Sequence, residues 1–225
     1  MSTEEYYFND PKKYLHKVFG TRIRAEIVRE FLGDISGTKI LDLGCGDGSI
    51  TMQFVKDNNI TFVDLSENML LLAKDAAGPG KANCRFIHST VTELPFQHEF
   101  DIVVAIGLLA HLDSVEEAIG KIKKYVKKGG YIVLQFSDQS NPLTKLNIAI
   151  SSRHYNRKIT GMSYASVIDI CKRNDLNVLK QIKYAFMLPG MGKLPDGLLY
   201  RIQRSTTKNK LFRFLYTDHM LMLQA

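Results

Sequence analysis

The 225-residue sequence has few of the features that mark secreted, metal-binding or membrane-spanning chains. Its three cysteines, Cys45, Cys84 and Cys171, lie far apart, with no CxxC pair and no nearby histidine cluster, so neither a disulfide framework nor a zinc site is predicted. The longest apolar run, Ile102 to Ala110, is about half as long as a membrane-spanning helix. The polar and acidic N-terminus lacks the basic start and apolar run of a signal peptide. We therefore expect a cytoplasmic protein.

The composition is close to the average for folded proteins, with 45% hydrophobic and 24% charged residues, and it predicts a single domain over residues 1–225. The net charge of +7 is concentrated near the C-terminus. Between Lys193 and Arg213 a single acid, Asp196, stands against six basic residues: Lys193, Arg201, Arg204, Lys208, Lys210 and Arg213. Three interpretations stay open, namely a solvated helix face, a site for an anionic acceptor, and contact with an acidic membrane surface.

Strand-like apolar runs alternate with helix-length segments through most of the chain, which is typical of an α/β domain built on a parallel sheet. The predicted strands are 38–43, 60–64, 84–88, 100–106, 130–136, 176–188 and 217–223. The predicted helices are 11–31, 49–56, 66–76, 114–127 and 163–173, and Ser66 is expected to cap the third of them. A long connection, about 189–213, separates the last two strands.

The most informative segment is ILDLGCGDGSIT, residues 40–51, where a buried strand runs into three alternate glycines, the first of which is Gly44. Glycines there allow a tight turn and a close approach of a ligand to the main chain. Asp64 follows twenty residues after Gly44, at the end of the next strand, where a carboxylate can accept both ribose hydroxyls of a nucleoside. A dinucleotide fingerprint would have a third glycine where Ser49 stands, and Asp42 would repel a pyrophosphate but tolerate a cationic ligand.

Five blocks in order, LDLGCGDG, FVDLS, LPF, FDIVVAIGLLAHL and VKKGGYIVL, resemble those of class I S-adenosylmethionine-dependent methyltransferases over roughly residues 39–136. The resemblance implies a Rossmann-like, seven-stranded, mostly parallel sheet with helices on both faces and an antiparallel last strand. It also implies S-adenosyl-L-methionine as the cofactor. Residues 1–35 would form a leading helical cap, 37–140 the cofactor-binding core, and 141–225 a substrate-side half carrying the basic insertion 189–213.

The resemblance also assigns cofactor contacts. Asp42 would lie near the methionine ammonium, the glycine loop would line the methionine half, and Asp64 would hold the ribose. Leu65 would pack on the adenine, and Ile106 would face the transferring methyl group. The contacts of the glycine loop are expected from Gly44, Cys45 and Gly46. Further contacts with the adenine are expected from Thr90 and Val91. The family commonly has an aspartate where Thr90 stands, and a threonine hydroxyl can still accept from the adenine amino group, although without charge.

Catalysis by such an enzyme needs an aligned nucleophile and, where the acceptor arrives protonated, a base. His111, just after the fourth strand, is the candidate base because its pKa suits proton removal near neutrality. Asp138 is a second candidate for orienting the acceptor, and packing or solvent contact is the alternative for both side chains. The leading segment would fold over the cofactor as a lid through Tyr6, Tyr7, Tyr14 and His16. No metal site is predicted, because the histidines form no ligand spacing.

Three functional hypotheses follow. The first is direct in-line transfer of a methyl group to oxygen or nitrogen of a small, anionic or partly apolar molecule. The fourth strand ends in Ala105-Ile106-Gly107-Leu108, not in the Asn/Asp-Pro-Pro-aromatic block of nucleic-acid amino methylases, which argues against base methylation. The second hypothesis is an RNA or protein methyltransferase that uses the basic surface. The third is a cofactor-binding protein without transferase activity.

Overall fold

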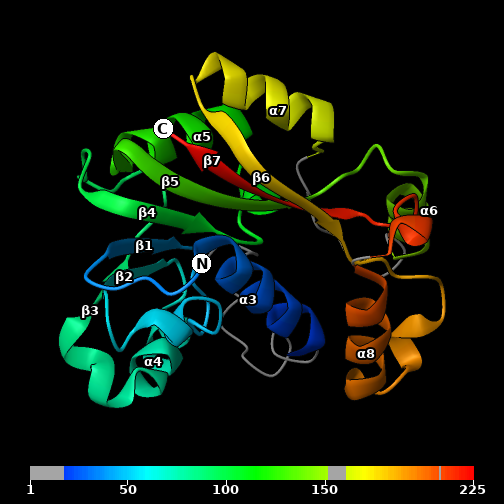
Figure 1. The fold of residues 1–225 in the computed structure, drawn as a ribbon, viewed down its shortest axis with the longest axis horizontal. Coiled ribbons are helices and arrows are strands. Elements are labelled where there is room, and N and C mark those ends of the chain that lie inside the picture. Colours follow the sequence, from blue (N-terminus) through cyan, green and yellow to red (C-terminus); the bar gives the residue numbers. More distant parts are fainter. Residues whose placement is uncertain (1–17, 152–160, 208) are drawn as a thin grey trace.

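The computed structural model describes residues 18–151, 161–207 and 209–225. These residues form one seven-stranded sheet with the strand order β3-β2-β1-β4-β5-β7-β6 (Figure 1). The strands are β1 (Lys39–Leu43), β2 (Asn59–Asp64), β3 (Cys84–His88), β4 (Phe100–Ala105), β5 (Val126–Ser137), β6 (Asn177–Tyr184) and β7 (Asp218–Gln224). The first five strands pair in parallel, and β7 is antiparallel to both of its neighbours. The predicted Rossmann-like α/β sheet and its reversed last strand are confirmed.

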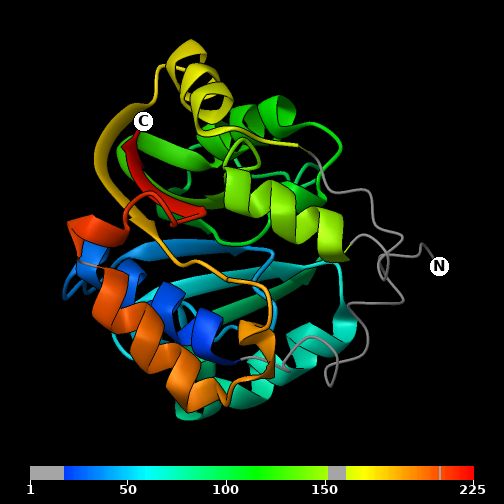
Figure 2. The ribbon, with the colours of Figure 1, turned by 90° about the vertical axis from the view of Figure 1, so that its right-hand side faces the viewer.

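Helices cover both faces of the sheet, as Figures 1 and 2 show. On one face α3 (Val18–Leu32) and α8 (Asp196–Thr207) lie side by side, and Leu70 of α4 (Glu67–Ala76) joins the same apolar core. On the other face α5 (Val115–Tyr125) and α7 (Tyr164–Arg173) pack against a second core. The helix α6 (Pro142–Ser151) follows β5. Because both faces are covered, β1 and β4 are almost fully buried, which explains their continuous apolar runs.

Serines begin three of the helices by the same local mechanism. The hydroxyl oxygens of Ser66, Ser114 and Ser163 accept hydrogen bonds from main-chain N–H groups at the starts of α4, α5 and α7, at 3.3, 3.2 and 3.1 Å. Each bond satisfies one of the donors that a helix start leaves without a partner. The predicted cap at Ser66 is confirmed.

The predicted helix at residues 49–56 is wrong. Instead, the segment forms turns and one short 3₁₀ helix, Met52–Phe54. The β-branched residues Ile50, Thr51 and Val55 disfavour an α-helix, and the Asn58 side chain ends the turn by donating to the Phe54 carbonyl at 2.9 Å. The connection at 189–213 is also more ordered than predicted, because it contains α8.

The parallel strands β1, β2 and β4 bring their carboxyl ends to one edge of the sheet. In the sheet, β2 and β3 lie on one side of β1, and β4 and β5 lie on its other side. The direction in which successive strands are added therefore reverses at β1. Ligands of open α/β sheets bind in the crevice at such a reversal. Separately, no helix within the described residues is long and apolar enough to cross a membrane.

Candidate functional site

A cavity of about 330 Å³ lies at this reversal, between the loops that follow β1, β2, β3 and β4. Its lining residues are Gly44, Gly46, Asp64, Leu65, Met69, Ser89, Thr90, Val91, Thr92, Ile106, Gly107, Leu108, His111, Leu112, Asp113, Ser114 and Glu117. The fold therefore brings together most of the residues predicted for the cofactor and the candidate base. Asp42 and Cys45 are the two predicted cofactor residues that do not line the cavity, and both are buried.

The main-chain N–H groups of the glycine loop are occupied inside the protein. Gly44 and Cys45 both donate to the Val63 carbonyl, at 2.8 and 3.0 Å, and Gly48 donates to the Cys45 carbonyl at 2.9 Å. Gly46 donates to the Asp64 carboxylate at 2.8 Å. A loop that cradles phosphate instead directs its N–H groups at the ligand. Because these donors are used, the loop is poorly suited to a pyrophosphate.

The glycines of the loop are required by both conformation and space. Gly44 has a φ of +65°, in the left-handed region, and an added Cβ would stand 3.0 Å from Leu108 Cδ1 across the cavity. At Gly48, with a φ of +77°, an added Cβ would stand 2.8 Å from Met52 Cε. Any side chain at Gly44 would therefore press against Leu108, which also lines the cavity.

Asp64 stands at the end of β2 with its carboxylate held in place. Besides the bond from Gly46, it accepts from the Ser66 N–H at 2.9 Å. Burial raises the pKa of Asp64, and the bonds from Ser66 and Gly46 oppose that rise. Each carboxylate oxygen keeps a lone pair for a further donor, which suits a ligand diol.

Asp42 lies behind the loop and is held by a hydroxyl. Its carboxylate accepts from Thr51 Oγ1 at 2.5 Å. Burial raises the pKa of Asp42 from 3.8 to about 7, because the charged form is desolvated, although the Thr51 bond opposes the rise. The expected contact with a methionine ammonium stays a prediction, since Asp42 does not line the cavity.

The raised pKa of Asp42 predicts a pH-dependent effect of Asp42→Asn on stability. A carboxyl that titrates near 3.8 unfolded and near 7 folded favours the folded state below about pH 4, and this contribution is lost as the pH rises through 7. Asparagine keeps an acceptor for Thr51 without the charge. We therefore expect the variant to gain about 1 kcal/mol at about pH 8, a Tm higher by about 2–4 °C, and no gain at about pH 4. Thermal unfolding of the apo protein measures this, with exposed Asp57→Asn as the control. Equal gains at both pH values would contradict the assignment.

The side of the cavity formed by Leu65 and the loop after β3 is rigidly supported. Leu65 is 40% exposed although it is apolar, and it lines the cavity wall. The buried Tyr125 hydroxyl donates to the Val91 carbonyl at 2.8 Å and fixes the loop after β3. Thr90 Oγ1 donates to Glu93 at 2.9 Å, so its oxygen can still accept from a ligand. These features fit a heterocycle between Leu65 and the loop that carries Thr90.

The sequence did not predict the acidic residues on the far wall. Asp113 and Glu117, at the start of α5, line the cavity together with Asp64, whereas the described lining residues include no lysine or arginine. The cavity is therefore electrostatically suited to a cationic ligand. The signal that could have found them is the run HLDSVEE, in which Ser114 caps α5 directly after His111.

The candidate base and the candidate orienting residue are placed differently. His111 lines the cavity at the end of a short 3₁₀ helix, Leu109–His111. Asp138 does not line it, because its carboxylate accepts from the Ser140 N–H and hydroxyl at 2.9 and 2.6 Å in a local turn. Asp138 also lies 3.8 Å from His219, and burial lowers the pKa of that histidine to about 4. The candidate lid residues Tyr6, Tyr7, Tyr14 and His16 lie outside the described residues.

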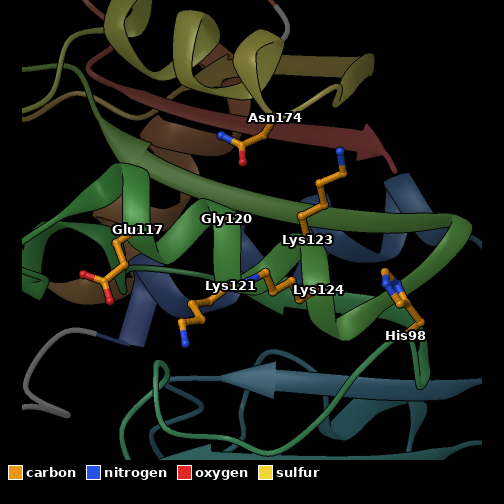
Figure 3. A pocket seen from close by; sticks show the side chains of 7 residues that line it. All are labelled: His98, Glu117, Gly120, Lys121, Lys123, Lys124 and Asn174. Carbon is orange, nitrogen blue, oxygen red and sulfur yellow. The ribbon is translucent and has the colours of Figure 1, made fainter.

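A second hollow, of about 400 Å³, lies along the outer side of α5 (Figure 3). Its side chains come from α5, from the segment before β4 and from the end of α7: His98, Glu117, Lys121, Lys123, Lys124 and Asn174. Lys123 is paired with Asp175 at 3.2 Å. The hollow lacks the glycine loop and the strand ends, so the cavity at the strand reversal is the candidate site.

The basic insertion is partly structural. Arg204 of α8 pairs with Glu26 of α3 at 2.8 Å, and Arg22 of α3 stacks on the Tyr200 ring at 4.0 Å. These contacts join the two helices across the sheet face. Lys208 lies outside the described residues. The roles of the insertion toward an anionic acceptor or an acidic membrane stay predictions.

Comparison with known proteins gives one matching family and several relatives. Residues 40–130 match the family model described as "Methyltransferase domain". A ubiquinone biosynthesis O-methyltransferase of Rickettsia akari is 24% identical over 141 residues, covering 61% of this chain and 56% of the relative. A demethylmenaquinone methyltransferase of Leptospira interrogans is 34% identical over 144 residues, covering 60% and 57%. The matched region thus spans little more than half the length of these relatives.

A crystal structure from Thermotoga maritima, described as an S-adenosylmethionine-dependent methyltransferase and possible histamine N-methyltransferase, has the same fold. It superposes with a TM-score of 0.71 at 15% identity, over 98% of this chain and 96% of that chain. At this identity the likeness concerns the fold alone. The architecture therefore extends beyond the matched residues to nearly the whole chain.

Proposed function

We propose that this chain is a class I S-adenosylmethionine-dependent methyltransferase that transfers a methyl group from S-adenosylmethionine to oxygen or nitrogen of a small molecule. The match of residues 40–130 to the methyltransferase-domain family model supports this proposal. The cofactor would occupy the cavity at the strand reversal. When bound, it supplies a sulfonium methyl group that an aligned nucleophile displaces directly.

The observation that carries this proposal is the polarity of the cavity. The loop N–H groups that would bind a pyrophosphate are used within the protein, and three carboxylates line the walls without a described lysine or arginine. S-adenosylmethionine brings an ammonium and a sulfonium, whereas a dinucleotide brings two phosphates. The same glycine loop therefore favours the cationic ligand.

The residues divide along the length of the cofactor. Asp64 accepts from the ribose hydroxyls, Leu65 packs on the adenine, and the loop of Thr90 and Val91 borders the adenine edge. The main-chain N–H of Gly44 is occupied, so Gly44 can offer a cation only its carbonyl oxygen. The buried carboxylate of Asp42 stabilises the methionine ammonium from a greater distance. Ile106, buried at the end of β4, borders the transferring group.

The acceptor is proposed to be a small molecule because the cavity at the strand ends has a volume of only about 330 Å³. The apolar side chains Ile106 and Leu108 lie on its acceptor side. One named relative is a ubiquinone biosynthesis O-methyltransferase and the other a demethylmenaquinone methyltransferase, and these names support a small-molecule acceptor. His111 is proposed as the base that removes a proton from an acceptor hydroxyl or ammonium.

A thermal-shift assay tests the cofactor assignment. At a concentration of S-adenosylhomocysteine about 100 times its Kd, binding adds about 2.7 kcal/mol to the free energy of unfolding. For a chain of this size we expect Tm to rise by about 5–10 °C. NAD⁺ at the same concentration is the control and should leave Tm unchanged. A larger shift with NAD⁺ than with S-adenosylhomocysteine would overturn the proposal.

A further inference from the structure

The turn that precedes β7, residues 209–216, carries two apolar side chains that are largely exposed. Leu211 and Phe214 are 73% and 72% exposed, more than any other large apolar residue that the structure describes. Single apolar residues are common on protein surfaces, whereas two such residues within one short turn form a patch that needs an explanation. We call this segment the exposed turn.

Hydrogen bonds fix the conformation of the exposed turn. The Asn209 side-chain oxygen accepts from the Leu211 N–H at 2.9 Å. The buried Tyr216 donates its hydroxyl to the carbonyl groups of Thr206 and Asn209, which ties the end of the turn to the end of α8. The exposure of Leu211 and Phe214 therefore belongs to a held conformation, and the fold presents both side chains to a partner.

The charges within and beside this turn are all basic. The sequence KNKLFRF, residues 208–214, carries two lysines and Arg213 but no acid. Arg213 stands between Leu211 and Phe214 and is exposed as they are. A partner that covers this surface therefore needs negative charge together with an apolar phase for the two large side chains.

A second exposed apolar strip lies on α6. Leu146 and Ile150 are 47% and 51% exposed, and they lie one helical turn apart on the same face of the helix. The helix contains no acid, and its one charged residue, Lys145, is exposed beside Leu146. Figure 1 places α6 and the exposed turn at the same end of the molecule, and Figure 2, which looks onto that end, shows them on its two sides. One flat surface can therefore meet both.

An anionic membrane surface fits these features better than a second copy of the chain or a nucleic acid. A symmetric contact between two copies would bring the basic residues of both turns together, and like charges repel. A nucleic acid would attract Arg213 but offers no apolar phase for Leu211 or for the strip on α6. An anionic bilayer supplies both, because lipid phosphates lie directly above the acyl chains.

We propose that the exposed turn and the α6 strip dock this chain on an anionic bilayer, with Leu211 and Phe214 inserted at the interface and Arg213 at the lipid phosphates. The strand β4 runs toward this end of the molecule (Figure 1), so docking brings the carboxyl ends of the parallel strands to the membrane side. The docking residues do not line the candidate cavity, so this inference is independent of the proposed cofactor.

Co-sedimentation of the full chain with two kinds of vesicle tests the inference. One kind contains phosphatidylcholine alone, and the other contains equimolar phosphatidylcholine and phosphatidylglycerol. We expect binding to the anionic vesicles to be at least about tenfold tighter, since each basic residue near an anionic surface contributes about fivefold. Added NaCl should weaken this binding, because salt screens the charges.

Four substitutions assign the binding to the two segments. Leu211→Ser, Phe214→Ser and Leu146→Ser should each weaken binding to the anionic vesicles about tenfold, because each removes one inserted apolar side chain. Arg213→Gln should weaken binding to the anionic vesicles about fivefold and leave binding to phosphatidylcholine unchanged. The Tm of all four variants should stay within about 2 °C of the wild type, since exposed side chains contribute little to stability.

Two variants on α4 are the matched controls. Leu71 and Lys74 are exposed there, outside both docking segments, so Leu71→Ser and Lys74→Gln should bind vesicles like the wild type. The inference is overturned by equal binding to both kinds of vesicle, by no binding to either, by unchanged binding of Phe214→Ser, or by a marked fall in its Tm. A dimer that Phe214→Ser dissociates would assign the patch to a second copy instead. Failure of S-adenosylhomocysteine to stabilise the protein would overturn the cofactor proposal and leave the docking inference standing.

Discussion

Asp64→Ala is expected to weaken S-adenosylhomocysteine binding by about 10- to 100-fold, because hydrogen bonds to a charged group contribute about 1.5–3 kcal/mol. Asp64 is the carboxylate that ends β2 on the cavity wall, fixed by the N–H groups of Gly46 and Ser66 at 2.8 and 2.9 Å. Its loss removes the acceptors for the ribose and also frees the Gly46 N–H. Calorimetric titration of the folded variant measures the change in Kd.

Two further variants make this measurement specific. Asp64→Asn keeps the size of the side chain but loses the charge and one acceptor oxygen, so its Kd should lie between those of the wild type and Asp64→Ala. Asp57→Ala removes the same charge at an exposed position before β2 and should bind like the wild type. Wild-type affinity of Asp64→Ala would exclude Asp64 from the binding site.

His111→Ala is expected to lower kcat for a hydroxyl acceptor about 100-fold at neutral pH, the usual lower range for loss of a general base. His111 lines the cavity beside Leu112 and Asp113, where the loop after β4 meets α5. The Kd of S-adenosylhomocysteine should change little.

The control for this variant is another histidine outside the cavity. His98 lies at the outer hollow of α5 with a φ of +49°, which asparagine tolerates better than most residues, so His98→Asn should keep the wild-type kcat (Figure 3). An unchanged kcat in His111→Ala would leave that side chain a packing role alone.

Much of the fold was predictable because its signals are local. Apolar runs ending in glycine mark β1 and its turn, and a serine before a helical pattern marks the starts of α4 and α5. The helix predicted over 49–56 failed where local propensity was weak and where the Asn58 side chain, anchored to the main chain of the preceding loop, ended the turn. The sequence allowed a solvated helix face in the basic insertion but did not give the bounds of α8, since that helix is stabilised by tertiary packing, with Leu199 buried in the core shared with α3.

The sequence by itself determined where the strands occur along the chain, the glycine loop, and the place of Asp64 at the end of β2. Each of these features depends on residues that are close together in the chain. The tertiary structure alone decided which charges and polar atoms face the cavity. The occupied N–H groups of the loop, and the meeting of Asp113 and Glu117 with Asp64 around one cavity, depend on segments that are separated in sequence. The physical reason is that the ligand selectivity of a site depends on the positions of hydrogen-bond donors and charges in space. The sheet sets these positions because it brings the carboxyl ends of its parallel strands to one edge.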